Sequence, residues 1–99
     1  MNSLSKKVFI DIETYAPIDL TIYGARLYTN HPKFRNIIAV FSPKPHKYIL
    51  VVGHKNILKK VKHYKDKGYK LIAHNASFEW ECTKEVTDFK DWLLSLIHI

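Results

Sequence analysis

The sequence predicts an α/β fold with a mixed sheet, antiparallel first strands and flanking helices. Three observations support this prediction. Short runs of β-branched and aromatic residues alternate with one longer amphipathic stretch. Two of these runs are separated only by a short proline-rich turn, which is typical of an antiparallel hairpin. The 99 residues, 46% of them hydrophobic, suffice for one domain with one core.

The first strand is predicted over residues 7–13, which are mostly β-branched and aromatic before the acidic end. Its apolar residues occur on both faces, so we expect a central strand that is buried on two sides. A turn-forming Ala-Pro pair ends it. Residues 18–35 are less regular, with a short helix that begins near Asp19 and is interrupted at Gly24.

The hairpin strands are predicted over residues 36–41 and 47–52, joined by a turn at residues 42–45. An amphipathic helix follows and ends near Gly68. Its apolar face recurs at helical spacing and consists of Ile57, Leu58, Val61 and Tyr64. Its other face is rich in lysine, which indicates either a solvated surface or a contact with nucleic acid.

A fourth strand is predicted over residues 70–74 and a last helix over residues 76–86, with Asn75 as its N-cap. The predicted order is therefore strand, loop, two strands, helix, strand, helix. This order describes an α/β domain with an antiparallel part, and not a doubly wound parallel sheet.

The charge of the chain favours a polyanionic partner, nucleic acid first. There are 16 basic and 9 acidic residues, which give a formal net charge of +7. Lysine and arginine bind phosphates with release of counterions, although basic proteins without such a partner also exist. No apolar run approaches the ~18 residues of a membrane helix, and we recognise no secretory leader, so we expect no membrane partner. The single cysteine suits a reducing compartment, and we expect a cytoplasmic location.

Asp11 and Glu13 are the first candidate site residues. They lie two residues apart at the end of the first predicted strand, so their side chains leave the same face, about 6.6 Å apart along the strand. Two carboxylates at this spacing can share a divalent ion, and hard oxygen ligands suit Mg²⁺ or Mn²⁺. The alternative interpretation is that acidic residues simply mark the end of a strand, where solvent begins.

Glu79 is the third candidate, because it falls in the first turns of the helix that follows the fourth strand. There it can face Asp11 and Glu13 if the two strands are neighbours, and the positive end of the helix favours it. Three carboxylates that converge in a basic protein repel one another unless cations neutralise them, so the arrangement favours a metal site. Phe78 can pack in the core or stack on a base of a single-stranded end.

Together these segments resemble the 3′–5′ proofreading exonuclease domain of phage-type family A DNA polymerases, a member of the DEDD exonuclease group with a ribonuclease H-like fold. The resemblance spans roughly residues 7 to 83. The residues that carry it are Asp11-Ile12-Glu13-Thr14, Asp19-Leu20, Gly24, Tyr28, His31-Pro32, Phe34 and Ala73-His74-Asn75-Ala76-Ser77-Phe78-Glu79.

The resemblance implies two-metal hydrolysis of the 3′-terminal phosphodiester of DNA. It assigns catalysis and the binding of two divalent ions, Mg²⁺ or Mn²⁺, to Asp11, Glu13 and Glu79. Glu79 departs from the pattern of the family, which places Asp there, so its role is less fixed than that of the first pair. Contacts with the single-stranded 3′ end of DNA are assigned to three more residues: Thr14, Asn75 and Phe78.

The third motif of the group, an Asp preceded by a Tyr or His, has no counterpart after residue 86. We therefore expect residues 1–86 to be the N-terminal part of an exonuclease domain, inactive alone, with a polymerase domain in the same full-length chain. Residues 87–99 end on an apolar run for which no partner surface is expected, and we interpret them as a truncated end. Residues 94–99 resemble the translation of a sequencing-library adaptor, so part of this end is expected to be non-native.

Two other functions fit the same residues. One is a non-catalytic, basic module that binds nucleic acid and keeps the fold without turnover, which the lysine-rich helix and the departure at Glu79 favour. The other is an exonuclease of the same group that acts on RNA. For the proofreading exonuclease of a DNA polymerase, the expected location is the cytoplasm of a bacterial or phage-infected cell.

Overall fold

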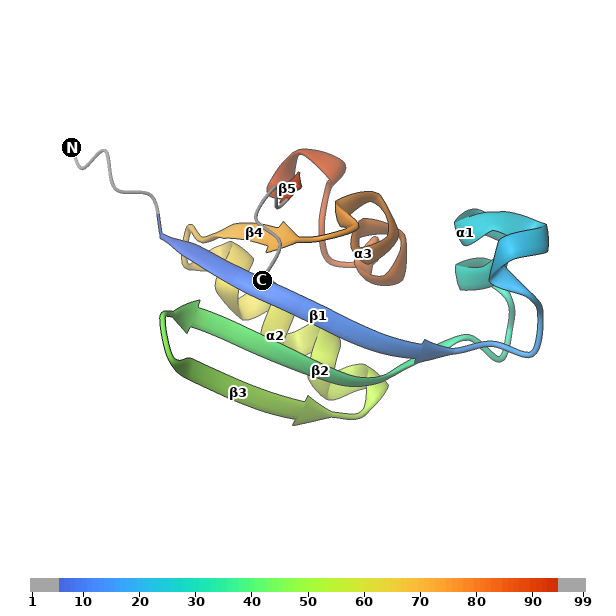
Figure 1. Ribbon diagram of the computed structural model, residues 1–99, viewed down its shortest axis with the longest axis horizontal. Helices are drawn as coiled ribbons and strands as arrows, with labels where there is room; N and C mark the ends of the chain where they lie inside the picture. The colour runs from blue at the N-terminus through green and yellow to red at the C-terminus, as the bar shows by residue number, and fades with distance from the viewer. Residues whose placement is uncertain (1–5, 95–99) are drawn as a thin grey trace.

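The chain has an α/β fold in which β1 is the central strand of a mixed five-stranded sheet (Figure 1). The computed structural model describes residues 6–94. The sheet has the order β3-β2-β1-β4-β5. The elements are β1 (Lys7–Tyr15), α1 (Leu20–Asn30), β2 (Arg35–Lys44), β3 (Lys47–Val52), α2 (His54–Asp66), β4 (Lys70–Ala73), α3 (Ala76–Thr83), a 3₁₀ turn (Phe89–Asp91) and β5 (Trp92–Leu94).

The sheet is antiparallel on one side of β1 and parallel on the other. β1 pairs antiparallel with β2 from Phe9 to Tyr15, and β2 pairs antiparallel with β3. On the other side β1 pairs parallel with β4, but only as far as Phe9. The far half of β1 is therefore hydrogen-bonded to a strand on one side only, and this leaves room beside it for the start of α3.

The predicted central position of β1 is confirmed, but the prediction that both of its faces are buried is wrong. Val8, Ile10 and Ile12 are buried, whereas their neighbours from Lys7 to Glu13 on the opposite face are exposed. Even the aromatic Phe9 keeps 40% of its surface accessible. The strand thus alternates as expected of a sheet with one covered face.

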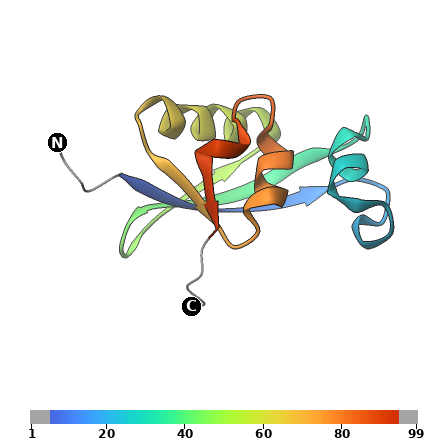
Figure 2. The ribbon, with the colours of Figure 1, turned by 90° about the horizontal axis from the view of Figure 1, so that it is seen from above.

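The covered face carries the core and lies under α2 and α3, which are on the same side of the sheet (Figure 2). The apolar face of α2 packs against the inward side chains of the central strands, and Phe41 stacks on Tyr64 with ring centroids 5.7 Å apart. Within residues 6–94, no helix covers the other face. Exposed apolar side chains lie there on three strands: Phe9, Tyr48, Leu50, Val52 and Leu93.

Residues 18–35 contain more helix than we expected. α1 begins after Asp19, whose side chain accepts hydrogen bonds from the Thr21 backbone N–H at 2.9 Å and from the Thr21 hydroxyl at 2.6 Å. Gly24 interrupts the helix as predicted, with φ 82° and ψ 164°, a conformation that favours glycine. The chain then resumes helical structure up to Asn30, before the His-Pro pair.

The end of the chain also differs from the prediction. α3 ends at Thr83 and not near residue 86, and the expectation that the apolar end lacks a partner surface is wrong for β5. Trp92 of β5 lies opposite Leu71 of β4 and is 6% exposed. Of the residues that resemble an adaptor, 95–99 lie outside the described part of the chain.

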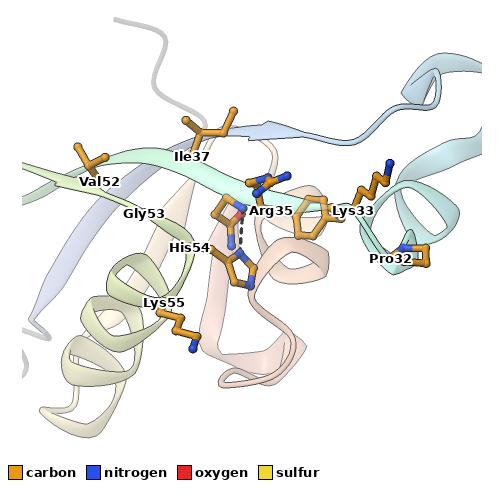
Figure 3. A pocket seen from close by; sticks show the side chains of 10 residues that line it. Pro32, Lys33, Arg35, Ile37, Val52, Gly53, His54 and Lys55 are labelled. Carbon is orange, nitrogen blue, oxygen red and sulfur yellow. Dashed lines mark hydrogen bonds between the residues drawn. The ribbon is translucent and has the colours of Figure 1, made fainter.

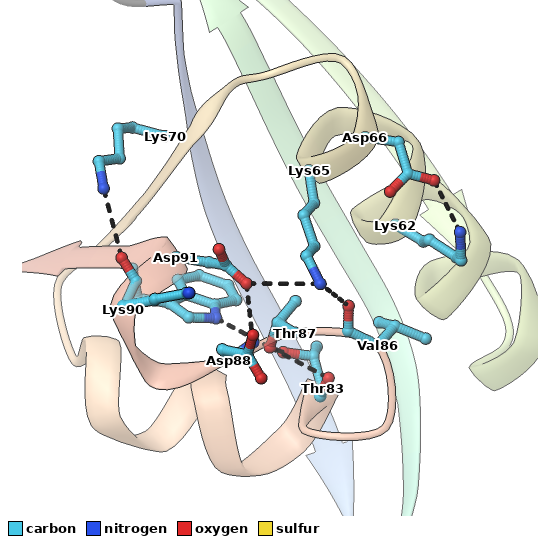
Figure 4. Close-up of polar contacts among 11 residues, drawn as sticks. Lys62, Lys65, Asp66, Lys70, Thr83, Val86, Thr87, Asp88, Lys90 and Asp91 are labelled. Atoms are coloured by element: carbon cyan, nitrogen blue, oxygen red, sulfur yellow. Dashed lines mark hydrogen bonds and ion pairs between the residues drawn. The ribbon is translucent and has the colours of Figure 1, made fainter.

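Polar contacts fix the segment between α3 and β5 against α2 (Figure 4). The Lys65 ammonium donates to the Val86 carbonyl oxygen at 3.2 Å and lies 3.7 Å from an Asp91 oxygen. The Trp92 indole N–H donates to the Thr87 hydroxyl at 3.1 Å. Because these contacts pair polar groups that are buried or partly buried, the segment is anchored although it has little regular structure.

Asn75 is the N-cap of α3, as predicted. Its side-chain oxygen accepts hydrogen bonds from the Phe78 backbone N–H at 3.3 Å and from the Ser77 hydroxyl at 3.1 Å. We expect Asn75→Ala to lower the free energy of unfolding by about 1 kcal/mol, because an orphan backbone N–H loses its acceptor. Urea denaturation measures this. Asn75→Asp keeps an acceptor and should retain most of the stability, and equal losses in both variants would contradict the capping role.

Candidate functional site

Asp11 and Glu13 lie on the exposed face of β1, close to its end. In the register with β2, Asp11 is opposite Val40 and Glu13 is opposite Ile38. The residues paired with them across the strand are thus apolar, and neither is a basic residue that would neutralise a carboxylate. The two acidic side chains therefore leave the sheet together over an apolar surface, as the two-residue spacing predicts.

Glu79 reaches β1 because β4 is short. β4 ends at Ala73, the chain turns through Asn75, and the first turn of α3 brings Glu79 beside the unpaired edge of β1. Its side chain is 5% exposed and accepts a hydrogen bond from the backbone N–H of Ile12. The carboxyl group thus occupies the place at which a longer β4 would have paired with β1.

The environment of Glu79 raises its pKa to about 7. Burial is the largest cause, because it penalises the charged form. The Ile12 N–H favours the charged form and lowers the pKa, while the negative charges of Asp11 and then Glu13 raise it. The three carboxylates named by sequence analysis therefore interact electrostatically, although they come from two elements that are far apart in the sequence.

The arrangement supplies part of a metal site. Asp11 and Glu13 are exposed oxygen ligands on one face, of the type that Mg²⁺ and Mn²⁺ prefer. Glu79 is buried and directed at the Ile12 N–H. Across residues 6–94 no three or more His, Cys, Asp and Glu side chains form a group that could hold a metal ion. The residues in place therefore fit a pair of ligands and not a closed set.

Thr14 and Phe78 both contact Tyr28 of α1. The hydroxyl groups of Thr14 and Tyr28 are 3.0 Å apart, and the rings of Tyr28 and Phe78 have centroids 6.3 Å apart. Tyr28 is also in edge contact with Phe34, at 5.7 Å. These contacts dock α1 against α3, and they leave Phe78 half-buried. Tyr28 is among the residues that carry the resemblance, but sequence analysis assigned it no role in the site.

A basic cavity lies where β2 and α2 begin (Figure 3). It has a volume of 620 Å³, and its basic lining residues are Lys33, Arg35, His54 and Lys55. His54 accepts a hydrogen bond at Nδ1 from the Asn36 backbone N–H at 2.9 Å, which fixes the ring at the cavity. Sequence reasoning did not find this site, and the only signal was a histidine directly after the glycine that precedes α2.

Asn36 connects this cavity with α3. It is fully buried, and its side-chain amide donates to the Cys82 carbonyl oxygen at 3.1 Å, while its Oδ1 has no partner within the described structure. In the sheet Asn36 is paired with Thr14, directly after the bulge that follows Glu13. The basic cavity and the carboxylates therefore lie on adjacent strands.

Comparisons with known proteins add no assignment: no family model matches the chain, and neither the curated proteins nor the solved structures yield a match. No helix in the part of the chain that the structure describes is long and apolar enough to span a membrane.

Proposed function

We propose that the chain is the N-terminal part of a 3′–5′ exonuclease domain of a DNA polymerase, which hydrolyses the 3′-terminal phosphodiester of a single strand. The observation that carries this proposal is the position of Glu79 beside β1, where burial first, and then the charges of Asp11 and Glu13, raise its pKa. The mixed sheet with antiparallel first strands and flanking helices is compatible with the ribonuclease H-like fold that the resemblance implies. The polymerase domain and the cytoplasmic location belong to the same proposal.

The proposal gives each residue a physical role. Asp11 and Glu13 hold divalent ions from the exposed face, and these ions, when bound, supply an activated water and stabilise charge on the reacting oxygens. Glu79 adds negative charge from a buried position. Asn75 orders the start of α3, and Phe78 presents a half-exposed ring to a terminal base. The positive net charge attracts DNA to an otherwise acidic site.

Manganese titration tests the proposed site on the chain itself. We expect calorimetry to detect Mn²⁺ binding at pH 7.5, and Asp11→Asn to remove it, because one of two exposed ligands loses its charge. Glu85→Gln is the matched control, since the Glu85 side chain is 73% exposed and lies beside His54, 3.9 Å from its Nε2 atom. Equal binding by the wild type and Asp11→Asn would contradict the proposal.

The basic cavity favours a second candidate function, a module that binds nucleic acid without cleaving it. Lys33, Arg35 and Lys55 line this cavity together with the start of α2, and none of them contributes to the carboxylate site. Such a module would bind DNA with a strong dependence on salt and would show no specific Mn²⁺ binding. Mn²⁺ binding that is lost in Asp11→Asn favours the exonuclease over this module.

A further inference from the structure

A second cavity, here called the sheet-face groove, lies on the uncovered face of the sheet and has a volume of 700 Å³. It extends from the start of β1 to the turn between β2 and β3. Its floor includes Phe9, Val40, Tyr48 and Ile72, and Asp11 lies at one end of this floor. The groove therefore shares Asp11 with the candidate site.

The floor of the sheet-face groove offers two exposed aromatic rings. Phe9 is 40% exposed and Tyr48 is 71% exposed. Phe9 is paired with Ser42 of β2 and with Ile72 of β4, which places its ring over the middle of the sheet. Tyr48 lies two strands away, so roughly 9–10 Å separates the two backbones. Flat rings at this spacing on a sheet are a platform on which bases can stack.

The rim of the groove is basic. Lys6 and Lys7 line it at the start of β1, and Lys44 and His46 line it at the turn between β2 and β3. Among the residues of the described range 6–94 that line the groove, Asp11 is the only acidic one. Pro43, near the end of β2, and Pro45, in the turn, also line the groove, and their fixed φ angles limit the movement of this part of the rim. Positive charges therefore border an apolar, aromatic floor.

This combination fits one chemical class of partner. Stacked bases match the exposed rings and phosphates match the lysines, whereas a purely apolar protein surface would leave these lysines without counter-charges. We propose that the sheet-face groove binds single-stranded DNA, with bases on Phe9 and Tyr48 and phosphates near Lys7 and Lys44. Because the groove ends at Asp11, the bound DNA would run from the carboxylates toward the turn between β2 and β3. This direction rests on the proposed function.

Binding of a fluorescein-labelled dT12 oligonucleotide to the full 99-residue chain, measured by anisotropy in EDTA, tests this inference. Tyr48→Ala should weaken binding by roughly 5- to 100-fold, the effect of removing one stacked base. Tyr48→Phe keeps the ring and should bind like the wild type. Lys7→Ala/Lys44→Ala should reduce the slope of log K against log salt concentration by about 1.4, the effect of two lost phosphate contacts.

Matched controls carry the same substitutions outside the groove. Tyr23 is 53% exposed on α1, and Lys59 and Lys67 are exposed at α2 and its C-cap. Tyr23→Ala and Lys59→Ala/Lys67→Ala should leave affinity and salt slope close to the wild type. Equal losses in groove and control variants, or no binding of dT12, would overturn the inference. A concentration-dependent dimer in sedimentation would also overturn the inference if Tyr48→Ala abolished the dimer without changing the affinity for DNA. The sheet face would then be a protein interface.

The EDTA condition separates this inference from the proposed function. Groove binding needs no metal, so it should persist in EDTA, whatever the outcome of the Mn²⁺ titration. Absence of Mn²⁺ binding by the wild type, together with intact groove binding, would count against the exonuclease alone. Intact Mn²⁺ binding with unchanged affinity in Tyr48→Ala would count against the groove alone.

Discussion

Asp11→Ala and Glu13→Ala are each expected to abolish 3′-terminal hydrolysis by the complete exonuclease that we propose. The two carboxylates supply the exposed oxygen ligands of the proposed site, and their loss removes several kcal/mol of charge stabilisation in the transition state. This corresponds to a fall in rate of roughly 1000-fold or more. A 5′-labelled single strand, incubated with Mg²⁺ under single-turnover conditions, measures the rate on a denaturing gel.

The same variants should bind single-stranded DNA as the wild type does, or slightly more tightly, because each removes a negative charge near the strand. This combination distinguishes lost chemistry from lost folding or lost binding. Glu85→Ala serves as the control, since it removes an exposed carboxylate just after the end of α3. Full activity in Asp11→Ala or Glu13→Ala would disprove the assignment of the site.

Glu79→Gln is expected to stabilise the protein above pH 7 by about 3 kcal/mol. The pKa of Glu79 is about 7 in the folded state and 4.5 without the fold. Between these values the folded protein keeps a proton that the unfolded chain releases, so the free energy of unfolding falls as the pH rises and levels off above pH 7. The amide side chain of the variant stays neutral at every pH and can still accept a hydrogen bond from the Ile12 N–H, so this loss is absent.

Urea denaturation between pH 4 and 8.5 measures the effect. The wild type should lose stability between about pH 4.5 and 7 relative to Glu79→Gln, and the two should converge below pH 4.5. Glu85→Gln, an exposed control, should shift stability by less than about 0.5 kcal/mol at any pH. Parallel curves for the wild type and Glu79→Gln would show that Glu79 is not held in the environment described.

The periodicity of apolar residues was sufficient to predict most of the sheet and α2. The antiparallel hairpin of β2 and β3, the apolar face of α2 and the Asn75 cap all follow from local patterns, and the structure confirms them. These features depend on residues that are close in the sequence. The spacing of Asp11 and Glu13 likewise fixed their common face, because alternation along a strand is a local property.

The features that were missed depend on contacts between distant segments. β5 is only three residues long and is held by pairing with β4 and by the polar contacts of Trp92, which no local pattern reveals. α1 continues beyond Gly24 because Tyr28 packs against Phe34 and Phe78, so tertiary contacts outweigh an interrupted local pattern. The unusual pKa of Glu79 depends on how short β4 is, which the sequence did not show.

A displacement of β1 by one residue against its neighbours would exchange its two faces. Val8, Ile10 and Ile12 would then meet water, and Asp11 and Glu13 would be turned into an apolar interior that cannot hold two charges. A one-residue insertion or deletion in this strand would thus disrupt both the core and the proposed carboxylate site. The register of β1 therefore couples the core and the proposed carboxylate site against insertions and deletions, whereas a substitution such as Asp11→Ala changes the site without changing the core.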